Sequence, residues 1–297
     1  MGLYRRNPEL VKKILRMREK IVRVEEIIGG KAIHPVTCIP GGISKGITAE
    51  ERREIEEYGK ELLDFSVEAV ELFSDLIEKG ENKEIVFGDY YVIRTHYAGI
   101  VDENNRVNFY DGKIRVVDVD GREIYKFGVE RYLDYISERV VPWSYTKMPY
   151  LKKIGWRGIV DGKDSGVYRV GPLGRLNAAD GFATPKAQEY YERFVELFGK
   201  PAHYTMAYHY ARVVEMVYAS ERMLELIQDD EIMSNDLINL EGEVTGRGFG
   251  AVEAPRGLLI HHYESDRDGI TTMANFIIPT TMNNPSMNID IKRVASK

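Results

Sequence analysis

The segment GRGFGAVEAPRGLLIHHY, residues 246–263, places glycines, a proline, an arginine and two adjacent histidines among apolar residues. Its β-branched and apolar runs predict strands from about Glu243 to Thr281. Gly246, Gly248 and Gly250 lack the G-x-G-x-x-G spacing and the following helix that a dinucleotide-binding loop needs. We therefore predict a tight bend with close backbone approach at these glycines.

Arg256 stands between Pro255 and Gly257 and is followed by apolar residues, so we expect its guanidinium to be buried. A buried guanidinium needs an anion or carbonyl partners, and the alternative is a structural ion pair with Glu253. His261 and His262 are adjacent, so on a strand they point to opposite faces and at most one could face a site.

The rest of the chain indicates a helix-rich α+β protein. Helical stripes cover residues 7–28 and 48–80, the second with a predicted reciprocal cap between Thr48 and Glu51. Residues 84–127 predict a small antiparallel sheet, and residues 141–181 are irregular. Helices return at about 185–197 and 204–228, and Asn283 begins a predicted polar tail. We expect one domain over residues 1–297 with a small β-rich insertion at about 84–128.

Composition excludes several classes of protein. The chain has 41 Lys and Arg against 47 Asp and Glu, a net charge of −6 without a basic cluster, which argues against nucleic-acid binding. No apolar run is long enough for a transmembrane segment and no secretion signal begins the chain, so we expect a cytoplasmic protein. The six histidines lack metal-ligand spacing, and the single cysteine, Cys38, is expected to be a small buried residue. Arg212 and Glu215, three apart on a helix, predict an intrahelical pair.

Several segments, in order, resemble the large subunit of nickel-iron hydrogenases, closest to the archaeal F420-non-reducing, viologen-reducing type. EAPRG followed by a histidine, and PTT-x-N some twenty residues later, are the specific matches. Supporting matches cover nearly the whole chain: GLYRRNPELVKKI, IIGGKAIHPVTCIPGG, NFYDGKIRVVDVDG, VPWSYTKMPYLKK, VGPLGRLNAADG and PAHYTMAYHYARVVEM. The resemblance implies the helix-rich fold of that subunit with small antiparallel sheets.

The resemblance also implies an oxidoreductase that splits or forms H2 at a nickel-iron centre with cyanide and carbon monoxide on the iron. Four cysteines from two C-x-x-C motifs, one near each end of the subunit, hold that centre, and neither motif is present here. We therefore expect the central portion of such a subunit, lacking N- and C-terminal segments, with no metal bound by this chain alone. Whether the chain counts as an enzyme by itself stays open. The implied partner is an iron-sulfur small subunit that carries the electrons.

Individual roles follow from the same resemblance. Arg256 matches the arginine over the open coordination position, and Pro255 and Leu259 match residues that wall the diatomic ligands. Thr280, with Pro279 beside it, matches the position that donates a hydrogen bond to a cyanide nitrogen. His34 matches a histidine in the region that faces the small subunit, and His261 matches a histidine with a structural supporting role.

Two other classes of function stay open. One is a non-catalytic scaffold subunit of an electron-transfer complex, like the hydrogenase-related subunit of respiratory complex I. The other is an α+β binding protein with a pocket near residues 142–181.

Overall fold

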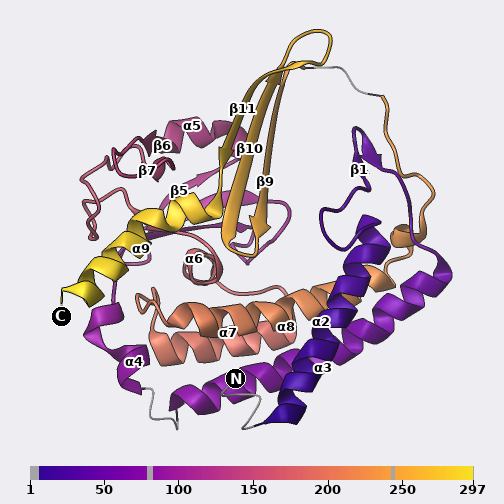
Figure 1. Cartoon of the computed structure of the whole chain (residues 1–297), viewed down its shortest axis with the longest axis horizontal. Coiled ribbons are helices and arrows are strands. Elements are labelled where there is room, and N and C mark those ends of the chain that lie inside the picture. The colour runs from indigo at the N-terminus through magenta and orange to yellow at the C-terminus, as the bar shows by residue number, and fades with distance from the viewer. Residues whose placement is uncertain (1–6, 79–82, 242–244, 297) are drawn as a thin grey trace. The chain divides into compact units, whose positions relative to one another are not determined.

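The structure, a computed structural model, describes residues 7–78, 83–241 and 245–296. By its internal contacts the chain divides into two compact units (Figure 1). Unit 1 comprises residues 1–69 and 216–243, and unit 2 comprises residues 70–215 and 244–297. The one-domain expectation stays a prediction, because compact units within one chain do not by themselves show independent folding.

Unit 1 is built from helices and one short hairpin. Its elements are α2 (Pro8–Gly29), β1 (Cys38–Ile39), β2 (Gly42–Ile43), the first part of α3 (Ala49–Glu78), the last part of α8 (Ala207–Gln228) and η3 (Asp230–Met233). The side chain of Asn7 caps α2 by accepting from Leu10 N at 3.0 Å. The predicted reciprocal cap of α3 is confirmed: Thr48 N donates to Glu51 at 2.7 Å, and Glu51 N donates to the Thr48 hydroxyl at 3.1 Å. Gly80, its predicted end, lies outside the described residues.

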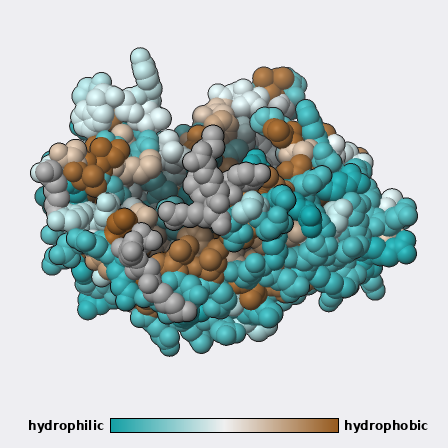
Figure 2. All heavy atoms as spheres, turned by 60° about the horizontal axis from the view of Figure 1, so that its bottom comes forward, coloured by the Kyte–Doolittle hydropathy of each residue, from teal (hydrophilic) through white to brown (hydrophobic). Residues whose placement is uncertain are grey.

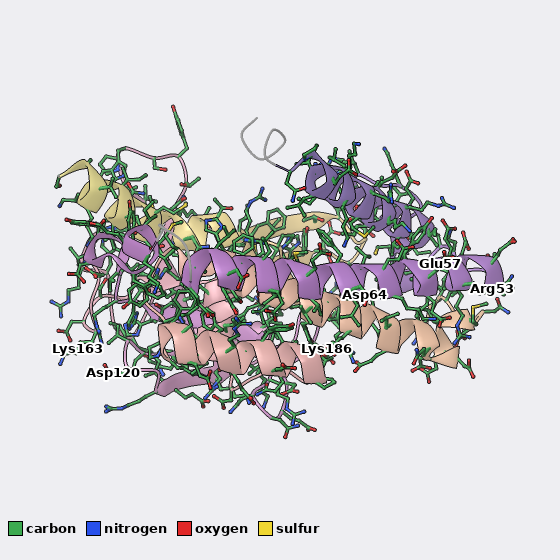
Figure 3. The ribbon with its side chains drawn as sticks, turned by 90° about the horizontal axis from the view of Figure 1, so that it is seen from below. Arg53, Glu57, Asp64, Asp120, Lys163 and Lys186 are labelled. Carbon is green, nitrogen blue, oxygen red and sulfur yellow. The ribbon has the colours of Figure 1, made fainter. Side chains whose placement is uncertain are left out.

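The apolar stripe of α3 forms one buried face in this unit. Leu62 and Phe65 are buried and pack with Met17 of α2. Arg53, Glu57 and Asp64 lie on the exposed side of the same helix, as Figure 3 shows. Amphipathic periodicity therefore sets the orientation of α3 within unit 1.

Unit 2 holds the sheets and the remaining helices. Its elements are α4 (Lys83–Phe87), η1 (Asp89–Tyr91), β3 (His96–Val101), β4 (Lys113–Val117), β5 (Glu123–Phe127), η2 (Val129–Arg131), α5 (Tyr132–Tyr135), β6 (Ile136–Arg139), β7 (Met148–Leu151), β8 (Tyr168–Arg169), α6 (Pro172–Ala178), α7 (Pro185–Phe198), β9 (Arg247–Ala254), β10 (Gly257–Ser265), β11 (Thr271–Ile277) and α9 (Pro279–Ala295). The order β5-β4-β3-β8 forms one sheet, with β8 parallel to β3, and β11-β10-β9 forms an antiparallel sheet. The main core includes Ile100, Leu258, Ile260 and Met282, so both sheets and α9 share it.

Several segments of unit 2 differ from the sequence-based prediction. The stretch 84–127, predicted as a sheet, begins with the helical segments α4 and η1, and the stretch 141–181, predicted to be irregular, contains β7 and β8. Residues 172–178, expected to be irregular, form α6, and all seven are buried, so the helix has no polar face to produce a periodic pattern. The polar tail predicted from Asn283 is wrong. Asn283 lies within α9, where burial of Met282, Pro285 and Ile289 outweighs the low helix propensity of the asparagines and the internal proline.

No helix among the described residues is long and apolar enough to cross a membrane. Hydrophilic side chains predominate on the face drawn in Figure 2, and hydrophobic residues form separate patches on it. Large apolar side chains are nonetheless exposed in both units, for example Leu240 in unit 1 and Trp143 in unit 2.

Candidate functional site

The centre of the site is the turn between β9 and β10. Ala254 pairs with Gly257, so Pro255 and Arg256 alone form the turn. Gly257 has φ +128°, and a Cβ built on it would lie 2.4 Å from Gly171 N. Only glycine allows this backbone-to-backbone contact between the turn and the start of α6.

The close approach predicted for Gly248 and Gly250 is wrong. Both lie in β9, and a Cβ added to either would meet no atom within 4 Å. No helix follows them, which agrees with rejection of a dinucleotide-binding loop. Glu243, where the predicted strands begin, lies outside the described residues.

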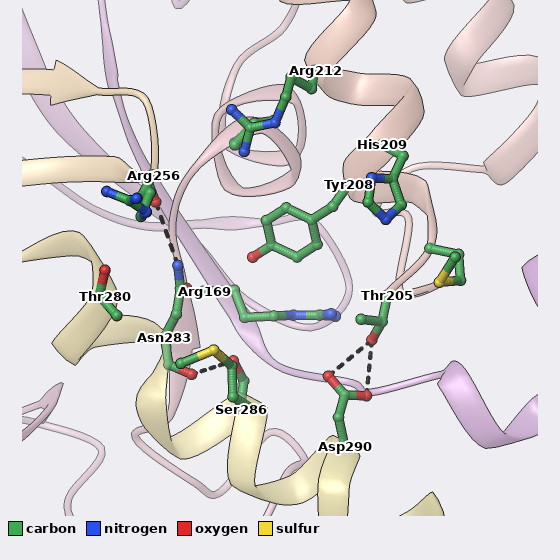
Figure 4. Close-up of a pocket in the computed structure, with 13 residues that line it drawn as sticks. Arg169, Thr205, Tyr208, His209, Arg212, Arg256, Thr280, Asn283, Ser286 and Asp290 are labelled. Atoms are coloured by element: carbon green, nitrogen blue, oxygen red, sulfur yellow. Dashed lines mark hydrogen bonds between the residues drawn. The ribbon is translucent and has the colours of Figure 1, made fainter. Parts of the chain in front are cut away.

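A cavity of about 290 Å³ lies beside this turn in unit 2. Residues from β8, α8, α9 and the β9–β10 turn line it (Figure 4). Its lining comprises Arg169, Pro172, Thr205, Met206, Tyr208, His209, Arg212, Arg256, Thr280, Asn283, Ser286, Met287 and Asp290. Three arginines against one carboxylate make this lining positive, which favours a ligand with negative charge.

Beneath the turn lies a buried ionic cluster centred on Arg175 of α6. Its guanidinium donates to Glu215 of α8 at 2.7 Å and to Glu253 of β9 at 2.6 Å. Glu253 also accepts from Ile100 N at 2.8 Å. Burial lowers the pKa of Arg175, but the charges of the two glutamates outweigh this and raise its pKa overall. Arg175 therefore stays charged, and its hydrogen bonds to Glu215 and Glu253 tie α6, α8 and β9 together.

Three sequence-based expectations are wrong here. Arg256 is exposed rather than buried, and it forms no ion pair with any described residue. Glu253, its proposed partner, pairs with Arg175 instead. Glu215 pairs with Arg175 too, and Arg212 donates to the carbonyl oxygen of Pro255 at 2.9 Å, so the predicted pair between Arg212 and Glu215 does not form.

Arg169 forms the floor of the cavity and is buried to 1% exposure. Its guanidinium donates to the Thr95 hydroxyl at 3.0 Å, to the Tyr97 hydroxyl at 2.6 Å and to the carbonyl oxygen of His203 at 3.2 Å. Its Nη1 has no partner among the described residues. A fixed cation thus lies below the cavity, held by neutral groups.

His203 is the titratable neighbour of this arginine. Its Nε2 lies 3.0 Å from the carbonyl oxygen of Val119, which can only accept, so the proton is on Nε2. Its Nδ1 lies 2.8 Å from the Tyr97 hydroxyl. Burial, and then the charge of Arg169, lower the pKa of His203 to about 4.

We expect this histidine to make the chain less stable in mild acid. Below about pH 6.5 the unfolded chain takes up a proton on this imidazole that the folded chain refuses until about pH 4, so lowering the pH favours unfolding. The slope contributed is about 1.4 kcal/mol per pH unit in that window. Urea unfolding from pH 7 to 4.5 measures it, and His203→Asn should flatten the profile while His209→Asn, an exposed control, should not. Parallel profiles for the original chain and His203→Asn would contradict the prediction.

The structure brings together only some of the residues singled out from the sequence. Arg256 and Thr280 both line the cavity. Pro255 and Pro279 precede them directly in the chain and Leu259 follows Arg256 by three residues, but none of the three is among the described residues that line the cavity. Their roles at a metal centre stay predictions.

The histidines and the cysteine lie elsewhere. His261 and His262 occupy opposite faces of β10 as predicted: His262 is buried, with Nδ1 3.0 Å from the Tyr132 hydroxyl, and His261 contacts Phe276. His34, in unit 1, is exposed with φ +57°. Cys38 is exposed, which corrects the expected buried position, because the β1–β2 hairpin leaves it outside the cores of unit 1. No described residues form a group of three or more His, Cys, Asp or Glu able to hold a metal ion.

Sequence reasoning did not single out Arg169, Arg175 or Asn283 as site residues. Arg175 and Asn283 lie in VGPLGRLNAADG and PTT-x-N, segments already noted for their resemblance. Their polar side chains within apolar surroundings were the available signal, since such groups are buried only with partners.

The sequence of the chain matches a family of known proteins. Residues 101–292 match the family described as nickel-dependent hydrogenase. The chain is 49% identical, over 96% of its length and 59% of the relative's, to an iron-sulfur subunit of the F420-non-reducing hydrogenase of Archaeoglobus profundus. It is 41% identical, over 99% of its length and 68% of the relative's, to a vhu subunit of the F420-non-reducing hydrogenase of Methanocaldococcus jannaschii. It thus spans about six to seven tenths of the length of these relatives.

Solved hydrogenase structures superpose on this chain. The crystal structure of an NAD+-reducing [NiFe]-hydrogenase in the H2-reduced state superposes with a TM-score of 0.91 at 33% identity, covering 99% of this chain and 63% of that one. A [NiFeSe]-hydrogenase from Dm. baculatum superposes with a TM-score of 0.67 at 20% identity, covering 91% of this chain and 58% of that one, which shows the fold alone. The expected helix-rich α+β fold of the hydrogenase large subunit is therefore confirmed, and the chain belongs to the nickel-dependent hydrogenase family.

Proposed function

We propose that this chain forms the wall of the nickel-iron centre in a hydrogenase large subunit, on the side of the open coordination position and the diatomic ligands. The observation that carries the proposal is the convergence of Arg256 and Thr280 on one positively lined cavity. These residues come from the two segments, EAPRG and PTT-x-N, that most resemble the family.

The described residues fit the outside of such a centre rather than its metal ligands. The positive lining suits a group that carries anionic cyanide, and cysteine thiolates are absent from the cavity lining. The hydroxyl of Thr280 makes no hydrogen bond to another described residue, so it can donate one into the cavity. When bound, the nickel-iron centre would supply the heterolytic cleavage or formation of H2.

The residues of this chain would contribute electrostatics and orientation. The guanidinium of Arg256 is always charged, so it would stabilise negative charge that develops beneath it without taking up a proton from solvent. Thr280 would fix the orientation of a diatomic ligand by hydrogen bonding. Arg212, which also lines the cavity, adds a second positive charge near the turn.

We further propose that the region around His34 faces an iron-sulfur small subunit. His34 adopts a left-handed backbone conformation that is uncommon outside glycine, and Ile33 and Val36 beside it are 70% and 62% exposed. Exposed apolar residues beside a strained position are typical of a surface that binds a partner. Loss of co-purification with the small subunit in a His34→Ala chain would support this assignment.

The experiment that tests the function is reconstitution. We expect elemental analysis of the purified chain to find less than about 0.1 nickel per chain, since a thiolate-held centre needs four soft ligands. Co-expression with segments that carry both C-x-x-C motifs, the hydrogenase maturation machinery and an iron-sulfur small subunit should restore nickel and H2-dependent reduction of a viologen dye. Stoichiometric nickel in the chain alone would overturn the prediction about metal content. A complex that assembles with nickel but leaves H2 unconsumed would overturn the proposed function and favour a scaffold role.

A further inference from the structure

We propose that Arg175, Arg212 and Asn283 are positioning residues that hold Arg256 at the cavity by binding three consecutive main-chain carbonyl oxygens, that of Ala254 at the end of β9 and those of the two turn residues. This inference rests on the proposed function, in which Arg256 acts at the metal centre. It assigns a role to Arg175 and to the asparagine of PTT-x-N, which the proposed function leaves without one, and a second role to Arg212.

The three donors come from three different helices. Arg175 of α6 donates to the carbonyl oxygen of Ala254 at 3.1 Å, and Arg212 of α8 donates to that of Pro255 at 2.9 Å. Asn283 of α9 makes a longer contact, 3.5 Å, to that of Arg256, drawn as a dashed line in Figure 4. In a turn of two residues between strands, the carbonyl oxygens of the two turn residues ordinarily face water. Here each carbonyl oxygen from Ala254 to Arg256 has a side-chain N–H within 3.5 Å, which restrains the movement of the turn.

Asn283 also joins this turn to the end of β8. Its Oδ1 accepts from Val170 N at 3.0 Å, and its Nδ2 lies 3.4 Å from the carbonyl oxygen of Val170. The Tyr208 hydroxyl donates to that same carbonyl at 2.9 Å. Because Gly171 and Gly257 meet backbone to backbone, a shift at Val170 would displace the turn. The amide of Asn283 therefore fixes both sides of one contact.

We call the contacts of Arg175, Arg212 and Asn283 to the three carbonyl oxygens the clamp. The clamp fixes the main chain of Arg256, whereas the side chain of Arg256 has no contact that fixes its guanidinium. Its guanidinium has no ion pair with a described residue, and the side chain is exposed, so no contact at its tip defines where it lies. A long arginine side chain carries considerable rotamer freedom, and a fixed Cα is the least costly way to restrict its reach. Preorganised donors contribute to catalysis only when they are already in place before charge develops.

Asn283→Asp tests the clamp with little change in shape. The aspartate keeps an acceptor for Val170 N but replaces the Nδ2 donor with a negative oxygen facing two carbonyl oxygens. Asn284→Asp is the matched control, because Asn284 is the next residue of α9 and donates to the Thr146 hydroxyl, away from the turn. Hydrogen exchange of the folded chain is measured on peptides that cover residues 252–260. We expect exchange there to rise about tenfold in Asn283→Asp and to stay unchanged in Asn284→Asp, with peptides that cover neither this turn nor Val170 unaffected in both.

Arg212 gives a second variant that does not depend on how Asn283→Asp folds, since its side chain is exposed. We expect Arg212→Met to raise exchange in residues 252–260, and Arg212→Lys, which keeps one donor, to restore part of the protection. Arg222→Met, on the same helix, is the control. In the reconstituted hydrogenase, Asn283→Asp and Arg212→Met should lower kcat several-fold with little change in KM for H2, whereas a merely structural residue would lower the amount of assembled enzyme.

The outcomes separate the two proposals. If neither Asn283→Asp nor Arg212→Met changes exchange or kcat while Arg256→Met does lower kcat, the positioning role is wrong and the proposed function stands. If exchange rises in the turn but Arg256→Met leaves H2 turnover intact, the proposed function is wrong and the clamp is a property of the fold only. A rise in exchange spread over all peptides would also overturn the positioning role.

Discussion

Replacing Arg256 with methionine is expected to lower H2 turnover by the reconstituted hydrogenase about 10²–10³-fold, the loss usual for one preorganised electrostatic donor. Methionine keeps much of the length of the side chain and removes its charge and its five donors. Because Arg256 is exposed and forms no ion pair with a described residue, the fold should tolerate the change. Turnover is measured as viologen reduction under H2, normalised to nickel content.

Two further variants show whether the loss belongs to the guanidinium. Arg256→Lys keeps the charge but not the planar fork, so we expect an intermediate loss. Arg267→Met removes another exposed arginine of unit 2, beyond β10, and should leave turnover unchanged. Equal turnover in Arg256→Met and the original enzyme would refute the role of Arg256. If turnover per nickel were unchanged and only the nickel content fell, Arg256 would act in assembly of the enzyme and not in turnover.

The second large effect is on stability. Arg175→Met should destabilise the chain by about 3–5 kcal/mol, because it leaves two carboxylates buried without their cation. The side chains of Arg175, Glu215 and Glu253 are 3%, 7% and 0% exposed, so water cannot replace the lost partner. The free energy of unfolding, from urea titration at pH 7, measures the effect.

An exposed ion pair and a compensated variant provide the controls. Arg222→Met breaks the pair between Arg222 and Glu225, whose side chains are 42% and 49% exposed, and should cost at most about 1 kcal/mol. Adding Glu215→Gln and Glu253→Gln to Arg175→Met removes the unpaired charges and should recover part of the loss. If Arg175→Met costs no more than Arg222→Met, the buried cluster does not stabilise unit 2.

Much of the fold could be predicted because the signals are local. The side-chain cap at Thr48 and Glu51 and the apolar stripe of α3 need only residues three or four apart. The cap is confirmed, and the stripe is buried or half-buried as far as Phe65, whereas Leu72 and Leu76 at its end are exposed. The opposite faces of His261 and His262 follow from the two-residue period of a strand. Placing Arg256 and Thr280 at one site came from family resemblance, and the cavity that both line agrees with it.

The partners of polar groups could not be predicted in this way. Arg212 and Glu215 are suitably spaced for a helical pair, yet each bonds to a residue at least 40 positions away. A buried charge is costly without a partner, so the buried carboxylates of Glu215 and Glu253 pair with the buried cation that the fold brings beside them, Arg175, whatever the spacing in sequence. The predictions of a buried Cys38 and of a polar tail from Asn283 were wrong for a related reason. The exposure of a hairpin and the packing of a helix depend on segments that are distant in the sequence.

The amino-acid sequence by itself determined the helices with local caps, the alternation along β10 and the kinship of EAPRG and PTT-x-N to the family. Only the tertiary structure decided that Arg256 is exposed at a cavity, that Glu253 belongs to Arg175, and that three helices hold the turn between them. The physical reason is that periodicity and capping act over one helical turn or two strand positions, whereas desolvation and charge pairing are settled by whichever groups the completed fold brings within hydrogen-bonding distance.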